Sequence, residues 1–237
     1  MAKKMRLDKL LGHCGWGTRR QLKELCKGGH VLVNDRCCTD SAAKVDPLHD
    51  VIQVDGTIVC YEERYYLMLH KPQGVLSATE DRFTKTVLDL LPQQYQGANI
   101  FPVGRLDKDT TGLLLLTNDG IWAHRITSPK KHINKIYEAA VDGCIPDHIE
   151  EIFQAGIVLA DGLQCLPAHA VATSEHTLEI TVQEGKFHQV KRMCAAVGLT
   201  VTALHRRSIG ALTLDASLEP GQYRRLTDEE KDLPFCE

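Results

Sequence analysis

The apolar positions near the start of the chain recur at helical spacing. Leu7, Leu10 and Leu11 fall on one face of a short helix. Thr18 and Gln21 have the spacing of a capping box, which indicates that a second helix begins there and continues to the Gly-Gly pair that follows. The pattern therefore predicts two short helices before residue 28.

Short runs of strand type follow these helices. Residues 31–33 form one run, and residues 51–54 and 57–60 flank an Asp-Gly dipeptide, which favours a tight hairpin turn. Two helices followed by short strands are typical of a small domain. We expect this domain to span residues 1–62 and a larger one to span residues 63–237.

The larger domain mixes strand and helix patterns irregularly. Strands are expected near residues 65–69, 113–117, 135–141, 178–183 and 200–207, and helices near 147–154, 187–197 and 227–232. Because the two patterns do not alternate regularly, a doubly wound parallel sheet is not expected. The prediction is an α+β fold, with a mainly antiparallel mixed sheet and flanking helices.

Charge is distributed unevenly between these two parts. The chain has a net charge of −3, which argues against a protein that simply coats nucleic acid, yet residues 1–36 hold nine Lys or Arg and only three Asp or Glu. Arg19, Arg20 and Lys23 fall on the polar side of the second predicted helix. This asymmetry indicates a basic module joined to a more acidic body.

The composition is that of an ordinary globular protein. Of the 237 residues, 43% are hydrophobic and 25% are charged, and no apolar run reaches the ~18 residues of a membrane span. No apolar stretch follows the basic N-terminus to make a signal peptide, so we expect a cytoplasmic protein without membrane contact.

The nine cysteines show no CxxC spacing, and we expect reduced, mostly buried thiols. A zinc site built from His30, Cys37, Cys38 and a distant partner is the alternative. Structural zinc sites normally have two closely spaced ligand pairs, and this set has no such pattern. We therefore expect no metal site here.

The most informative chemistry lies in the glycine-flanked loop 104–112. Asp107 and Arg105 stand there, directly before four consecutive leucines that are expected to form a buried strand. Active-site side chains are commonly mounted in this way, on a loop fixed by a rigid sheet.

Further motifs accompany this loop along almost the whole chain. They are the opening Met5–Leu10 with Thr18–Arg20, then Lys71–Gly74, Lys135–Tyr137 and Glu184–Met193. Together and in this order they resemble the pseudouridine synthases, in particular the branch that modifies ribosomal RNA and carries a small N-terminal RNA-binding domain. The N-terminal module is similar to the RNA-binding motif of ribosomal protein S4.

The resemblance implies an isomerase that converts uridine to pseudouridine without a cofactor or metal. It places Asp107 as the single essential aspartate, Tyr137 as the flat surface for the everted base, and Lys191 as the basic partner of the aspartate. Arg105 is expected to fill the space that the nucleotide vacates or to contact its phosphate.

The segment 187–197 also carries a helical pattern. A buried stripe is expected from Val190, Met193, Cys194 and Val197. On another face the spacing brings His188, Lys191 and Arg192 together, and Lys191 is expected to keep Asp107 ionised by proximity.

Basic residues from several segments are expected to contact RNA: Arg6, Lys9, Arg19, Arg20, Lys23, Lys71, Lys131, His188, Arg192 and Arg206. The sequence after Phe235 has no long basic tail of the kind that some large-subunit enzymes carry. We therefore expect action on small-subunit (16S) ribosomal RNA or an assembly intermediate. We also expect a monomer. Action on large-subunit (23S) ribosomal RNA is the alternative.

Two other classes of function compete with this interpretation. Residues 107–111 match the DxDxT pattern of aspartyl-phosphate phosphatases, but Pro102, Gly104 and Arg105 interrupt the apolar strand that such enzymes have ahead of it. A non-catalytic RNA-binding or ribosome-assembly factor needs the basic module alone. It predicts that Asp107→Asn has no consequence.

Overall fold

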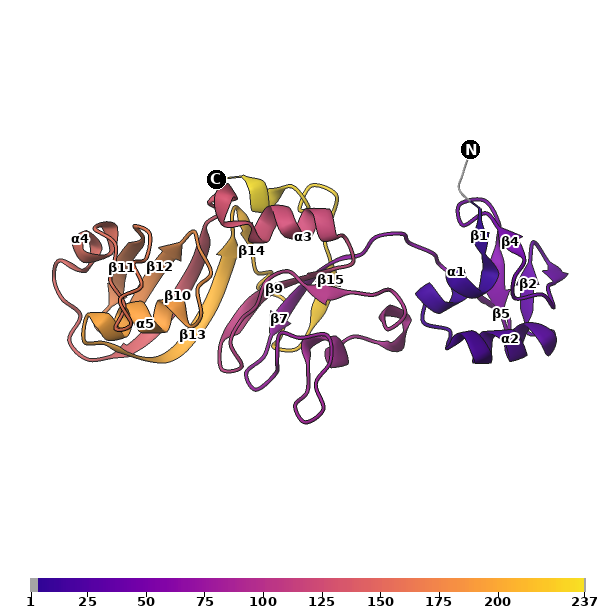
Figure 1. Cartoon of the computed structure of the whole chain (residues 1–237), viewed down its shortest axis with the longest axis horizontal. Helices are drawn as coiled ribbons and strands as arrows, with labels where there is room; N and C mark the ends of the chain where they lie inside the picture. The colour runs from indigo at the N-terminus through magenta and orange to yellow at the C-terminus, as the bar shows by residue number, and fades with distance from the viewer. Residues whose placement is uncertain (1–3, 237) are drawn as a thin grey trace. The chain divides into compact units, whose positions relative to one another are not determined.

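The structure, a computed structural model, describes residues 4–236 and divides into two compact units (Figure 1). The first unit holds the described residues up to Tyr65 together with Leu91–Phe101, and the second holds Tyr66–Leu90 and the described residues from Pro102 onward. Each unit has its own β-structure and its own buried core.

Two helices begin the first unit as the apolar spacing predicts. Helix α1 (Leu7–His13) buries its three leucines completely, and α2 (Arg19–Lys27) buries Leu22 and Cys26. The capping box is confirmed, because the Thr18 amide donates to the Gln21 side chain at 2.8 Å and the Gln21 amide donates to the Thr18 hydroxyl at 3.4 Å.

Short strands complete this unit. They are β1 (Met5–Arg6), which pairs with β4 (Lys44–Val45), and a four-stranded sheet in the order β3 (Arg36–Cys37), β2 (Val31–Val33), β5 (Ile52–Val54) and β6 (Thr57–Ile58). Asp55 and Gly56 both have positive φ, as a tight hairpin turn requires. The 3₁₀ turn η2 (Gln93–Tyr95) also belongs to this unit.

A larger mixed sheet forms the second unit. Its main path runs β11 (His169–Ser174), β12 (Thr177–Val182), β10 (Lys135–Asp142), β13 (Thr200–Ile209), β9 (Thr111–Thr117), β7 (Tyr66–Lys71) and β15 (Tyr223–Arg225), with β14 (Leu212–Thr213) beside β13 and β8 (Phe101–Pro102) beside β9. Along this path only β13 and β9 run parallel. The prediction of a mainly antiparallel mixed sheet in an α+β fold is confirmed.

Helices cover parts of this sheet. Helix α4 (Ile149–Gln154) and α5 (Gln189–Ala196) share one core with the sheet, in which Phe153 and Met193 are fully buried against Leu178 and Ile180 (Figure 1). The alternation of buried and half-exposed residues along β12 explains how one face of the strand supplies this core.

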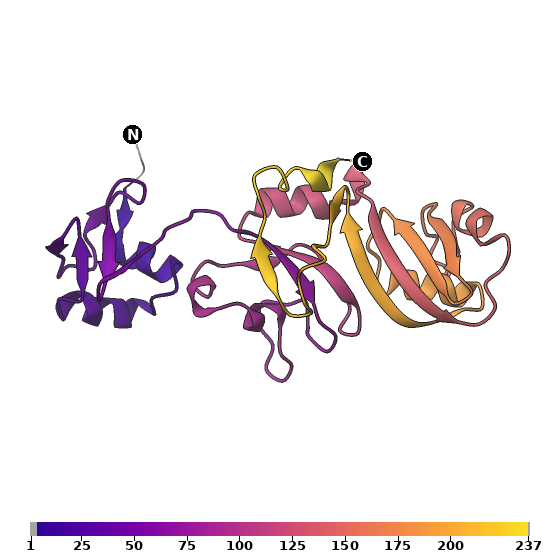
Figure 2. The same cartoon turned by 180° about the vertical axis from the view of Figure 1, so that it is seen from behind.

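Helix α3 (Gly120–Thr127) lies beside the last described residues (Figure 2). The Trp122 ring donates to the Lys231 carbonyl at 2.9 Å, and the Arg125 guanidinium lies 3.9 Å from the centre of the Phe235 ring. Short 3₁₀ turns complete the unit: η1 (Val87–Leu90), η3 (Pro129–Lys131) and η4 (Leu233–Phe235). In the part of the chain that the structure describes, no helix is long and apolar enough to cross a membrane.

The predicted helix over residues 227–232 is wrong. The side chains of Thr227 and Glu230 each accept a hydrogen bond from the other's backbone amide, as at the start of a helix. Only turns follow, however. The Glu230 carboxylate is held by Arg224 at 2.7 Å, and Pro234 has no N–H to donate to the Glu230 carbonyl, so an α-helix cannot continue through it. The segment therefore ends in η4 instead.

The cysteines differ from expectation in their exposure. All nine are free thiols, but only Cys14, Cys26, Cys165 and Cys194 are buried, so the prediction of mostly buried thiols is wrong. His30, named above as a possible zinc ligand, bonds through Nδ1 to the Asp55 carboxylate at 2.6 Å.

Candidate active site

The register of three neighbouring strands brings the predicted site residues together. Gly112 on β9 pairs with Arg206 on β13, and Arg206 pairs with Tyr137 on β10. At Gly112 the backbone has a φ of +105°, and a Cβ there would lie 2.3 Å from the Arg206 carbonyl oxygen. Only glycine permits this contact. We call residues 103–110 the Asp107 loop. Only strand β13 therefore separates the strand that follows this loop from the strand of Tyr137.

Backbone hydrogen bonds fix the Asp107 loop from its buried side. The Ser77 hydroxyl donates to the Leu106 carbonyl at 2.9 Å and accepts from the Leu106 amide at 3.1 Å. The Gly74 amide donates to the Lys108 carbonyl at 2.8 Å. Both neighbours of Asp107 are therefore held by the segment that follows β7.

Lys71 is buried beneath this loop. Its side chain has no exposed surface, and its Nζ donates to the carbonyls of Thr110 at 2.8 Å, Pro72 at 3.1 Å and Lys108 at 3.3 Å. Burial lowers the pKa of Lys71 to about 8, although the carboxylates of Asp109 and Asp107 oppose that shift. The expected contact between Lys71 and RNA is corrected here, because this lysine braces the loop from inside.

Two basic groups from the start of α5 face the carboxylate of Asp107. Lys191 Nζ lies 3.3 Å from Asp107 Oδ2, and His188 Nε2 lies 3.5 Å from Oδ1. His188 precedes the helix with a left-handed φ of 48°, a strained conformation of the kind that clusters at functional sites. The predicted stripe on the opposite face of α5 is confirmed, because Val190, Met193 and Cys194 are buried and Val197 packs against the same core.

Lys191 is shared between two carboxylates. It also contacts Asp109, and this hydrogen bond lowers the pKa of the Asp109 carboxyl. Asp107 is the more protected of the two, since its side chain is 27% exposed and that of Asp109 is 62% exposed. Lys191 therefore links both ends of a short acidic turn to α5. Its pairing with Asp109 was not predicted from the sequence.

Arg206 supports Tyr137 from within the sheet. It is 4% exposed, its Nε donates to the Leu113 carbonyl at 2.8 Å, and its Nη1 lies 3.5 Å from the Tyr137 hydroxyl. Within residues 4–236, its Nη2 has no hydrogen-bond partner. The expectation that Arg206 follows an RNA backbone at the surface is corrected, because its guanidinium is held behind the half-buried tyrosine.

A cavity of about 650 Å³ opens above these residues, within the range of pockets that hold small organic ligands. Its lining includes Arg105, Asp107, Lys135, Tyr137, Phe187 and Arg206. Arg105 is exposed, whereas burial lowers the pKa of Lys135 to about 8, with the charge of Arg206 adding to the shift. We call this space the Asp107 cavity.

The other basic residues expected at RNA lie in several places. Arg192 pairs with Asp161 at 2.5 Å, and Arg6 pairs with Asp8 at 2.5 Å, so both guanidinium groups already have a carboxylate partner. The remaining ones are exposed: Lys9, Arg19, Arg20 and Lys23 in the first unit and Lys131 in the second.

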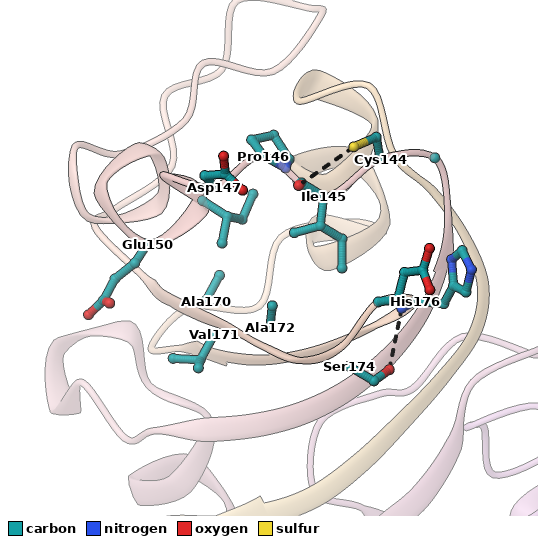
Figure 3. A pocket seen from close by; sticks show the side chains of 13 residues that line it. Cys144, Ile145, Pro146, Asp147, Glu150, Ala170, Val171, Ala172, Ser174 and His176 are labelled. Carbon is teal, nitrogen blue, oxygen red and sulfur yellow. Dashed lines mark hydrogen bonds between the residues drawn. The ribbon is translucent and has the colours of Figure 1, made fainter.

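A second cavity, of about 590 Å³, lies in the second unit between the strand β11 and the start of α4 with the residues before it (Figure 3). Its polar lining includes Cys144, Asp147, Glu150, Glu175 and His176. None of the described residues around it is Lys or Arg, so three carboxylates leave it unsuited to a phosphate backbone. The Asp107 cavity is the better candidate for an active site.

Sequence reasoning did not single out Ser77 or Asp109 as parts of this site. Ser77 follows the Lys71–Gly74 motif by three residues. Asp109 belongs to the DxDxT pattern that also matches the aspartyl-phosphate phosphatases. Both act through contacts that only the folded chain reveals.

Two families match the chain, one for each unit. Residues 65–196 match the family described as RNA pseudouridylate synthase, and residues 5–59 match the S4 domain. Both sets of residues contain the motifs on which the resemblance was based.

Relatives match along almost the full length. The chain is 46% identical to the Bacillus subtilis protein named "Uncharacterized RNA pseudouridine synthase YtzG", over 97% of this chain and 98% of that protein. It is 40% identical to the Escherichia coli "Ribosomal small subunit pseudouridine synthase A", over 95% and 98%. A solved structure titled "Crystal structure of pseudouridylate synthase" superposes with a TM-score of 0.69 at 35% identity, over 97% of this chain and 99% of that one.

Proposed function

The chain belongs to the RNA pseudouridylate synthase family, and from this premise we propose that it converts a uridine of small-subunit (16S) ribosomal RNA to pseudouridine with Asp107 as the catalytic carboxylate. The observation that carries the proposal is the position of Asp107, beside Lys191 and in one cavity with Tyr137. The small-subunit substrate is supported by the names of full-length relatives such as the E. coli protein.

The reaction itself is an isomerisation. The bond from C1′ to N1 of the uracil breaks, the base turns, a bond from C1′ to C5 forms, the proton on C5 leaves and N1 gains a proton. No group donor or electron acceptor takes part. The enzyme must take the uridine out of its stack, hold the detached base and supply a charged group at the sugar.

The residues around the cavity suit these tasks. Asp107 supplies the carboxylate, whether it adds to C1′ or removes a proton from the sugar, and the ammonium of Lys191 lies 3.3 Å from it. The ring of Tyr137, braced by Arg206, offers a flat surface for the uracil. Arg105 is exposed at the same cavity, and in this proposal it contacts the phosphate or fills the vacated stack.

The first unit supplies binding energy in this proposal. Arg19, Arg20 and Lys23 project from α2 into solvent within the part of the chain that matches the S4 domain. Such exposed cations bind phosphates through counterion release, independently of base sequence. We place the functional boundary between this RNA-binding domain and the catalytic domain at residues 62 and 63.

Tritium release tests the proposal directly. Transcripts of small-subunit and large-subunit ribosomal RNA, labelled at C5 of uridine, are incubated with the native protein, Asp107→Asn and, as a matched control, Asp147→Asn in the second cavity. Native protein and the control should release tritium from the small-subunit transcript, and Asp107→Asn should release none.

Other outcomes separate the alternatives. Release from the large-subunit transcript alone would overturn the assigned substrate, and release that survives Asp107→Asn would remove the role of that residue. If native protein binds the RNA but releases no tritium from either transcript or from assembly intermediates, a non-catalytic assembly factor is the better account. Loss of release with EDTA would contradict a metal-free reaction.

A further inference from the structure

Phe187 presents an aromatic ring to solvent at the Asp107 cavity. Phe187 is 69% exposed, yet it lines that cavity together with Asp107 and Tyr137. Large aromatic residues normally bury most of their surface, and an exposed ring beside a binding cavity is a surface available for a ligand.

The ring is supported on one of its faces. Phe187 stacks on the imidazole of His188, with 3.8 Å between the ring centres and 19° between the planes. The same imidazole lies 3.5 Å from the carboxylate of Asp107. The stacked pair therefore starts at the proposed catalytic group and extends outward to an open aromatic surface.

Hydrogen bonds hold the backbone around this pair. The Lys186 amide donates to Gln189 Oε1 at 3.0 Å, and the Gln189 amide donates to the Lys186 carbonyl at 3.2 Å. The Lys186 side chain binds the Gln164 carbonyl at 2.7 Å and the Glu184 carboxylate at 2.7 Å. Phe187 thus stands on a turn that is fixed at Lys186 and Gln189, so little ordering is needed when a ligand binds.

The charges nearby identify the kind of ligand. Arg105 and Lys108 line the same cavity and are exposed, whereas Lys186 and Lys191 are already paired with carboxylates. A flat aromatic surface among cationic groups is the arrangement that proteins use for single-stranded RNA, where bases stack on rings and phosphates meet the cations.

Resting on the proposed function, we propose that Phe187 is a stacking platform for the unpaired base next to the target uridine. The target uracil itself is assigned to the half-buried ring of Tyr137, so the exposed ring receives a neighbour on the same strand. Eversion of the uridine breaks the stacking of that neighbour, and Phe187 replaces the lost contact. This makes Phe187 a binding residue that favours substrates with an unpaired purine beside the target, since purines stack more strongly.

Kinetics on a small-subunit transcript test this role with three variants. Phe187→Leu keeps an apolar side chain without a π face, Phe187→Trp keeps the stacking surface, and Phe83→Leu is a matched control at a ring that is 95% exposed and does not line the Asp107 cavity. Phe187→Leu should raise KM about tenfold, with kcat within about twofold. The tryptophan variant and the control should both keep the native KM.

A fluorescent base locates the contact. With 2-aminopurine placed on either side of the target, native protein should quench its fluorescence at one of the two positions, and Phe187→Leu should lose that quenching. Equal KM values for native protein and Phe187→Leu, or quenching that persists in this variant, would overturn the platform. A change in melting temperature with Phe187→Leu would indicate a structural role, which the exposure of the ring argues against.

The two proposals fail in different ways. If native protein releases no tritium, the proposed function fails whatever Phe187 does. If native protein is active and Phe187→Leu matches it in both KM and base fluorescence, only the stacking platform fails.

Discussion

The Asp107 loop and the basic face of α2 are built on opposite principles. The loop is held by Ser77, Gly74 and the buried Lys71, so the carbonyls on both sides of Asp107 have fixed donors. On α2, Arg19 and Arg20 extend into solvent from a helix whose stability comes from its capping box and its buried face.

This difference matches the tasks that we propose for the two regions. A reaction requires a carboxylate placed to within a fraction of an ångström, and such placement needs a rigid surrounding shell. Attraction of a phosphate backbone needs only mobile positive charge, which tolerates imprecise positions. Substitutions in the loop should therefore act on kcat, and substitutions on α2 should act on affinity and its salt dependence.

The largest effect on kcat is expected when the cation beside Asp107 is removed. Lys191→Met should lower kcat at least about 10²-fold with little change in RNA affinity, because the carboxylate loses its fixed partner. Single-turnover tritium release measures the chemical step. Lys85→Met removes the same charge from an exposed position outside the Asp107 cavity and should leave kcat unchanged. Equal rates for the two variants would contradict the assigned pairing.

A smaller effect is expected when the brace beneath the loop is removed. Lys71→Met leaves three carbonyls without their donor but also removes a buried charge, so the free energy of unfolding should fall by about 2 kcal/mol. Because the loop then shifts, kcat should fall about tenfold. Chemical denaturation and single-turnover rates give both values. A variant that loses affinity instead would place Lys71 at the RNA after all.

The matching change on α2 should leave the chemistry intact. Arg19→Ala combined with Arg20→Ala should weaken RNA binding about tenfold at low salt and reduce the slope of log affinity against log salt by about 1.5. Neither side chain is buried, so the melting temperature should not change. Filter binding over a range of salt concentrations makes the measurement. An unchanged slope would remove both arginines from the interface.

The smallest predicted effect is a pH response that differs between the two units. Burial lowers the pKa values of Lys71 and Lys135 in the second unit to about 8, below the ordinary 10.5, so the unfolded chain binds more protons between these values. Stability of the second unit should therefore rise from pH 8 to 9, by about 1 kcal/mol for each lysine.

The first unit should respond in the opposite sense at higher pH. Burial raises the pKa of Cys14 to about 12 and that of Cys26 to about 11, so their contribution is complete below pH 9 and is lost above it. Each unit contains one tryptophan, Trp16 in the first and Trp122 in the second. Denaturation of Trp16→Phe and Trp122→Phe, followed by fluorescence, reports each unit separately. Parallel pH profiles from the two reporters would contradict the difference.

Local patterns predicted much of this fold. The capping box at Thr18, the turn at Asp55 and the buried stripe of α5 each depend on residues close in sequence, and each is confirmed. Helix α3 was missed because it begins at Gly120, a weak helix former, although Asp119 caps it with two hydrogen bonds.

The site was less predictable than the fold where long-range contacts decide the outcome. The resemblance brought Asp107, Tyr137 and Lys191 to one place, and the structure puts all three around one site. The burial of Lys71 and Arg206 depends on carbonyls 39 and 93 residues away, at Thr110 and Leu113. No local pattern distinguishes such a buried cation from one at the surface.

Gly112 has a consequence for how this enzyme can change. Because a main-chain atom of β13 occupies the space that a side chain at position 112 would need, the separation between the strand after Asp107 and the strand of Tyr137 is set by backbone atoms alone. Exchanging side chains elsewhere in the cavity therefore leaves the spacing of β9 and β13 at Gly112 unchanged. A change of RNA target would therefore have to come from the turns and side chains around this fixed backbone contact, and not from position 112 itself.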